Sequence, residues 1–91
     1  MITEPSFWEI VAIKEHNGHN KDDPSKRLGR IMQIADYDIV VGKSMLMRCV
    51  EPGYHKSMIT SPIIEWWLED EDNKLFIKTE NSIYELRRTD L

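Results

Sequence analysis

Residues 63–78 of the chain read IIEWWLEDEDNKLFIK, and this stretch decides the expected fold. Ile64, Trp66 and Leu68 alternate with Glu65, Trp67 and Glu69, which is the two-residue period of a strand that buries one face. The polar tetrapeptide at 70–73 is typical of a turn, and a second apolar run follows it. We therefore predict a β-hairpin with strands at residues 63–69 and 75–78, backed by a third strand at residues 82–86.

Most of the remaining sequence extends this β pattern. Further strands are expected at residues 29–35, 39–41, 44–50 and 56–61. The first two of these runs flank the turn-prone residues 36–38, which predicts a second hairpin. In the third run, Met45, Met47 and Cys49 share one face by the two-residue period. Pro62 cannot donate a ladder hydrogen bond, so we expect a bend, a bulge or a sheet edge there.

The first element is open to two interpretations. Residues 7–14 are rich in β-branched and aromatic side chains, which favours a strand. Ser6 and Glu9 form a capping-box pattern after Pro5, and Gly18 could end a helix. The expected fold is therefore mostly β, a small curled antiparallel sheet or a partly open SH3-like barrel of about six strands. The alternative is an α+β fold with an N-terminal helix packed on an antiparallel sheet.

Length and composition indicate one ordinary globular domain. The chain has 91 residues, of which 41% are hydrophobic and 31% are charged, enough apolar surface to offset the entropy of ordering. No linker or repeat divides it, so we expect residues 1–91 to form a single domain. Residues 16–28 are almost entirely polar and are expected to form one long loop, and loops of this length often carry function.

The cysteine content and the N-terminus suggest a cytoplasmic protein. Cys49 is the only cysteine, so no disulfide can form within the chain, and a reducing compartment is expected. No segment has the pattern of a secretion signal or approaches about 18 consecutive apolar residues, so no membrane partner is expected. A core this small gives modest stability, so a homo-oligomer or a protein partner would add useful contacts.

No set of residues predicts catalysis, a metal or a cofactor. His16 and His19 lie near Asp22 and Asp23, but an intervening glycine and asparagine do not favour convergence on a metal ion. Cys49 is expected to pack in the core, where a thiol is inert. We therefore expect the protein not to be an enzyme, because no acid, base and nucleophile can be assembled from the sequence.

The two adjacent tryptophans are the most informative residues for function. Neighbouring side chains on a strand point to opposite faces, so Trp66 is expected in the core and Trp67 on the surface. An exposed tryptophan is a typical interface anchor. The sequence thus suggests a noncatalytic protein-binding module, such as a regulator, inhibitor or accessory subunit of the kind frequent in bacteria and phages. The expected partner-binding residues are Trp67, Glu65, Glu69, Asp70 and Asp72.

The alternative is a small barrel that binds nucleic acid. Its phosphate contacts would come from the basic residues of the loop at 21–30, namely Lys21, Lys26, Arg27 and Arg30. The net charge of −4 and the two aspartates within this segment weigh against it, because such binding depends on clustered positive charge.

Overall fold

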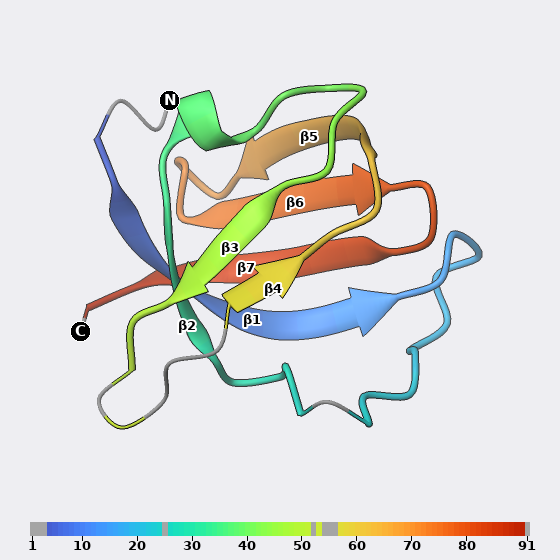
Figure 1. Cartoon of the computed structure of the whole chain (residues 1–91), viewed down its shortest axis with the longest axis horizontal. Coiled ribbons are helices and arrows are strands. Elements are labelled where there is room, and N and C mark those ends of the chain that lie inside the picture. The colour runs from blue at the N-terminus through green and yellow to red at the C-terminus, as the bar shows by residue number, and fades with distance from the viewer. Residues whose placement is uncertain (1–3, 25, 52, 54–56, 91) are drawn as a thin grey trace.

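The described part of the chain folds into one antiparallel sheet of seven strands, in the order β4-β3-β2-β1-β7-β6-β5 (Figure 1). The computed structural model describes residues 4–24, 26–51, 53 and 57–90. The elements are β1 (Ser6–Lys14), β2 (Ile31–Ile34), the 3-10 helix η1 (Asp36–Asp38), β3 (Leu46–Cys49), β4 (Ser57–Ile59), β5 (Ile63–Glu69), β6 (Lys74–Thr79) and β7 (Ile83–Thr89).

The sheet is strongly curled, which confirms the mostly β prediction. Figure 1 shows β3 and β4 lying in front of β5, β6 and β7, while β1 and β2 connect the two halves. The start of β5 reaches the segment before β3: Gly42 N–H donates to the Ile63 carbonyl at 2.8 Å, and Ile63 N–H donates to the Lys43 carbonyl at 3.0 Å. Along the described residues the two ends of the sheet do not otherwise pair, so it is not closed into a barrel.

Strand β1 occupies the middle of the sheet and excludes the N-terminal helix of the alternative fold. It pairs antiparallel with both β2 and β7. Trp8, Ile10 and Ile13 are buried, and a bulge between Ile10 and Ala12 accounts for the three-residue step between the last two. Ser6 does not cap a helix, because it is the first residue of β1; its hydroxyl donates to the Glu4 carbonyl at 3.2 Å. β-branched and aromatic residues prevail here because they fill both faces of a central strand.

The curled sheet encloses one cluster of buried side chains. It consists of Trp8, Ile10, Ile13, Met32, Ile34, Ile39, Met45, Met47, Ile63, Leu75, Ile77, Tyr84 and Leu86. The methionine face predicted around β3 is confirmed, and Cys49 packs against the same cluster. The residues between them, Leu46 and Arg48, are exposed as the alternation requires.

The hairpin predicted between residues 29–35 and 39–41 is wrong. Strand β2 pairs with β1 and β3 instead. Asp38 Oδ2 accepts a hydrogen bond from Ala35 N–H at 2.9 Å, which stabilises η1 and turns the chain so that Ile39 enters the core. Val41 then makes only an isolated bridge. The 3-10 helix η1 therefore replaces the predicted hairpin turn, and β3 pairs with the edge of β2.

The C-terminal hairpin forms where the sequence predicts it, but its first residues differ. A bulge between Ile63 and Glu65 shifts the register, so Ile63 is 2% exposed and Ile64 is 44% exposed. The expected core position of Ile64 is therefore wrong. Beyond the bulge, Trp66 and Leu68 pack against the core cluster as predicted.

In the part of the chain that the structure describes, no helix is long and apolar enough to cross a membrane.

Candidate functional site

An aromatic stack lies on the outer face of the C-terminal hairpin. Trp67 on β5 is directly opposite Phe76 on β6, and their ring centroids are 5.2 Å apart with an interplanar angle of 5°. Trp67 Nε1 also donates to Glu69 Oε2 at 2.9 Å, so the indole is fixed both by stacking and by a hydrogen bond. Both rings are half-buried. Trp67 thus lies on the outer side of the sheet, as predicted, but it is only partly exposed because Phe76 covers one face of its ring.

Charged side chains border this stack along both strands. Glu65 is paired in register with Lys78, and Glu69 with Lys74. These residues share the outer side of the sheet because Leu75 and Ile77, which alternate with them on β6, are buried. We call this surface the hairpin face; it comprises Glu65, Trp67, Glu69, Lys74, Phe76 and Lys78. Three of the five predicted partner-binding residues belong to it.

The other two predicted residues lie at the tip that joins β5 to β6. Asp70, Glu71 and Asp72 have φ angles of 54°, 53° and 67°, in the left-handed region that side chains seldom adopt. Asn73 N–H donates to the Asp70 carbonyl at 3.0 Å and closes the turn. Asp70 is exposed and Asp72 is half-buried. The tip therefore places an acidic group at the end of the hairpin face rather than on it.

The basic residues of the predicted nucleic-acid site are largely engaged within the chain. Lys21 Nζ donates to the Asn81 carbonyl and to the Ser82 hydroxyl, both at 2.8 Å, in the turn between β6 and β7. Arg30 forms an ion pair with Glu51 at 2.9 Å. Each cation thus ties the loop to another part of the fold. The structure does not gather them into one exposed basic patch.

Asp23 organises the second half of the same loop. Its carboxylate accepts hydrogen bonds from Arg27 Nε at 3.1 Å and from Leu28 N–H at 2.8 Å. Burial raises the pKa of Asp23, but the amides of Leu28 and Arg27 and the Arg27 guanidinium outweigh it, so the pKa lies below its ordinary value. Arg27 also donates to the Tyr84 hydroxyl at 3.3 Å. Of the four predicted cations, Lys26 is exposed to solvent.

The two loop histidines make hydrogen bonds to different parts of the chain. His16 Nε2 lies 2.7 Å from the Thr79 carbonyl oxygen, which accepts the hydrogen bond and fixes the loop against the end of β6. At His19 the backbone N–H donates to Asn17 Oδ1 at 3.0 Å. Across the described residues, no group of three or more histidine, cysteine or acidic side chains gathers where it could hold a metal ion.

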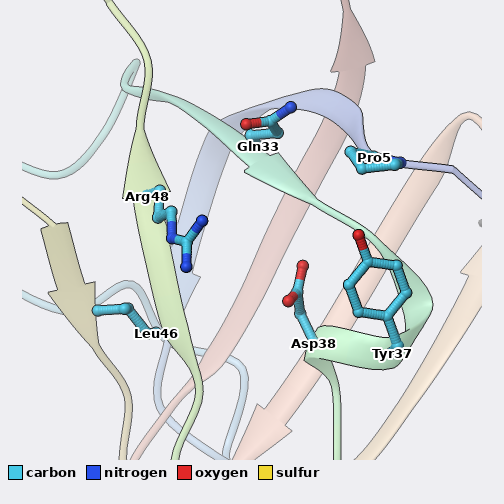
Figure 2. Close-up of a pocket in the computed structure, with 6 residues that line it drawn as sticks. All are labelled: Pro5, Gln33, Tyr37, Asp38, Leu46 and Arg48. Carbon is cyan, nitrogen blue, oxygen red and sulfur yellow. The ribbon is translucent and has the colours of Figure 1, made fainter.

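A pocket of about 540 Å³ opens on the outer face of the other half of the sheet (Figure 2). It is lined by Pro5, Gln33, Tyr37, Asp38, Leu46 and Arg48. The guanidinium of Arg48 and the ring of Tyr37 come from β3 and η1, and Tyr37 is 67% exposed. The wide solvent exposure of this lining makes the pocket a shallow depression. It offers one cation and one carboxylate for polar contacts.

The sequence alone could not locate this pocket. It forms because β2 pairs with β3 through Gln33 and Arg48, whereas the sequence indicates a hairpin between β2 and residues 39–41. The sequence also does not single out Phe76 as a site residue. Phe76 lies opposite Trp67 because Glu69 pairs with Lys74 across the four-residue tip.

Comparison of the chain with protein-family models, with curated proteins and with solved structures gave no significant match. The proposed function therefore rests on the surfaces of the molecule.

Proposed function

We propose that the protein is a noncatalytic protein-binding module, a regulator, inhibitor or accessory subunit, that engages its partner through the hairpin face and the acidic tip. The observation that carries this proposal is the Trp67/Phe76 stack on the outer side of the sheet, with the indole fixed by Glu69. Trp67 therefore places a large apolar ring on the outer face of the sheet, among charged side chains.

The fixed ring suits recognition because little conformational entropy is lost when a partner covers it. Stacking on Phe76 and the hydrogen bond to Glu69 already restrict the side chain of Trp67 in the unbound protein. Interface hot spots commonly consist of such an aromatic anchor with charged groups at its rim. Here the rim is formed by two glutamates and two lysines of the hairpin face.

The charge of this region favours a basic partner. Residues 61–91 contain eight acidic and four basic side chains, whereas residues 1–60 contain eight of each. Glu65 is exposed on the hairpin face, and Asp70 is exposed at the tip. Complementary charge on a partner would accelerate association and select its orientation.

Nucleic-acid binding through the loop at 21–30 is the second proposal and has weaker support. Lys21, Arg27 and Arg30 already contact acceptors within the chain. Phosphate binding would have to displace these contacts, which reduces the gain from neutralising the phosphates.

The proposal is tested by affinity capture with quantitative mass spectrometry from the source cells, using three forms of the chain. The double variant Trp67→Ala/Glu69→Lys should lose the captured protein by at least about tenfold while circular dichroism shows the same fold. Tyr37→Ala is the matched control, because it removes an exposed aromatic ring that does not belong to the hairpin face and should retain the partner. Loss with Tyr37→Ala alone, or capture of nucleic acid instead of protein, would overturn the proposal.

A further inference from the structure

We propose that the partner supplies an extended segment that adds to the open edge of β5 as an eighth strand, with the side-chain order basic, apolar, arginine or aromatic, apolar, basic. This inference rests on the proposed function and specifies the chemistry of its partner. It follows from the position of β5 in the sheet, from its pairing with β6, and from the charges on its outer face.

Strand β5 is one of the two edge strands. At its start Ile63 is bridged to Val41, but among the described residues no strand pairs with the outer edge from Glu65 to Glu69. An edge strand directs every second N–H and C=O away from the sheet, and an extended peptide can pair with these groups. The edge thus provides a binding surface for backbone as well as for side chains.

Strand β6 shows which sequence fits beside β5. Its residues 74–78 read Lys-Leu-Phe-Ile-Lys, a basic, apolar, aromatic, apolar, basic series. In register, the two lysines are opposite Glu69 and Glu65, and Phe76 is opposite Trp67. A strand on the other edge of β5 would meet the same three outer-face residues in the same two-residue period. β6 is therefore an internal template for the partner.

The central residue of the partner strand would meet the second face of Trp67. Phe76 occupies one face at a nearly parallel angle of 5°, so a flat group fits the opposite face best. Arginine is favoured over a further aromatic ring, because a guanidinium can stack on the indole and also pair with the adjacent Glu69 carboxylate. Basic residues two positions before and after it would lie opposite Glu65 and Glu69.

The two apolar positions of the partner strand would cover the inner side of the edge. Trp66 and Leu68 face the core cluster but remain half-buried, whereas Leu75 and Ile77 opposite them on β6 are fully buried. The difference arises because β5 has a neighbour on one side only. Apolar partner residues would complete the burial of Trp66 and Leu68.

A second copy of the chain fits this edge less well. An antiparallel pair of β5 strands that places Trp67 opposite its own copy also places Glu65 opposite Glu69, twice. Like charges directly opposite each other destabilise a strand pair. The acidic side chains on this edge therefore select a basic segment and oppose self-association.

The test uses synthetic nine-residue peptides with Lys-Leu-Arg-Ile-Lys at the centre, flanked by glycine and serine. Binding is measured by titration and by amide hydrogen exchange of the full chain. We expect slower exchange within residues 65–69. Replacing both peptide lysines by glutamate should weaken binding by at least about tenfold. Two further peptides are N-methylated on one or the other alternating set of backbone amides. Binding should be abolished only in the peptide whose methylated amides face β5.

Two charge variants of the chain complete the experiment. Glu65→Lys should weaken peptide binding about fivefold or more, while Asp22→Lys, an equal charge change in the exposed loop, should leave it unchanged. Absence of binding at about 1 mM peptide, binding without protection of residues 65–69, or equal effects of the two variants would overturn the inference. If Trp67-dependent capture of a protein persists in that event, only the strand addition fails; if capture fails too, the proposed function falls with it.

Discussion

Replacing Ile63 and Ile64 by alanine, one at a time, distinguishes a hairpin with a bulge from one with regular alternation. Ile63 is 2% exposed, so Ile63→Ala removes a buried side chain and leaves a cavity, at a cost of about 3 kcal/mol in the free energy of unfolding. Ile64 is 44% exposed and lies outside the core, so Ile64→Ala should cost less than about 1 kcal/mol. A regular alternation through Ile64, Trp66 and Leu68 predicts the opposite order.

Urea unfolding followed by tryptophan fluorescence gives both free energies, with unchanged m-values as the control for two-state behaviour. Thermal unfolding should show a difference of roughly 10 °C or more between the two variants, since a domain of this size shifts by about 4 to 8 °C per kcal/mol. Equal costs, or a larger cost at Ile64, would show that the bulge between Ile63 and Glu65 is incorrectly placed.

Three further substitutions probe the tip and the loop. Glu71 has a φ of 53°, so Glu71→Gly should raise the free energy of unfolding by about 0.5 to 1 kcal/mol in urea titrations; a loss would contradict the left-handed turn. The pKa of Asp23 is lowered from 3.8, so the stability lost in Asp23→Asn should be constant above about pH 5 and disappear as the pH falls through and below 3.8; a pH-independent loss in chemical unfolding at graded pH would refute this. Lys21→Met should lower the free energy of unfolding by about 1 kcal/mol, because Lys21 donates hydrogen bonds to the turn at residues 81–82. An unchanged free energy of unfolding together with weaker nucleic-acid binding would show that Lys21 binds nucleic acid and does not stabilise the fold.

The sequence predicts best where local pattern and tertiary pairing agree. The hairpin at β5 and β6 has a two-residue period from Glu65 onward and an acidic turn, and both its strands and the opposite faces of Trp66 and Trp67 follow from them. The methionine face of β3 is likewise a local signal. These features need no knowledge of distant contacts.

Other features depend on pairings that the local sequence does not encode. Ile63 and Ile64 are chemically identical, and the bulge selects the first for the core because its backbone also bonds Gly42 and Lys43. The pocket near Arg48 requires β2 to pair with β3. The sequence of the loop does not show that two of its cations contact acceptors distant in the chain, Arg30 with Glu51 and Lys21 with the turn at residues 81–82.

Within the candidate site, the sequence identifies Trp67, Glu65 and Glu69 through their common face. It does not indicate that Asp70 and Asp72 lie apart from that face, because their left-handed conformations arise from closing a short tip. The stack with Phe76 required the register of the hairpin, which the turn length alone leaves ambiguous.

Amide hydrogen exchange on the complex with the captured protein partner tests the central claim most directly. If the hairpin face and the edge of β5 bind the partner, exchange should slow by at least about tenfold within residues 65–69 and stay unchanged in residues 16–24 and 26–28. Protection confined to that loop or to the pocket around Tyr37 and Arg48, with unchanged exchange in β5, would contradict the account.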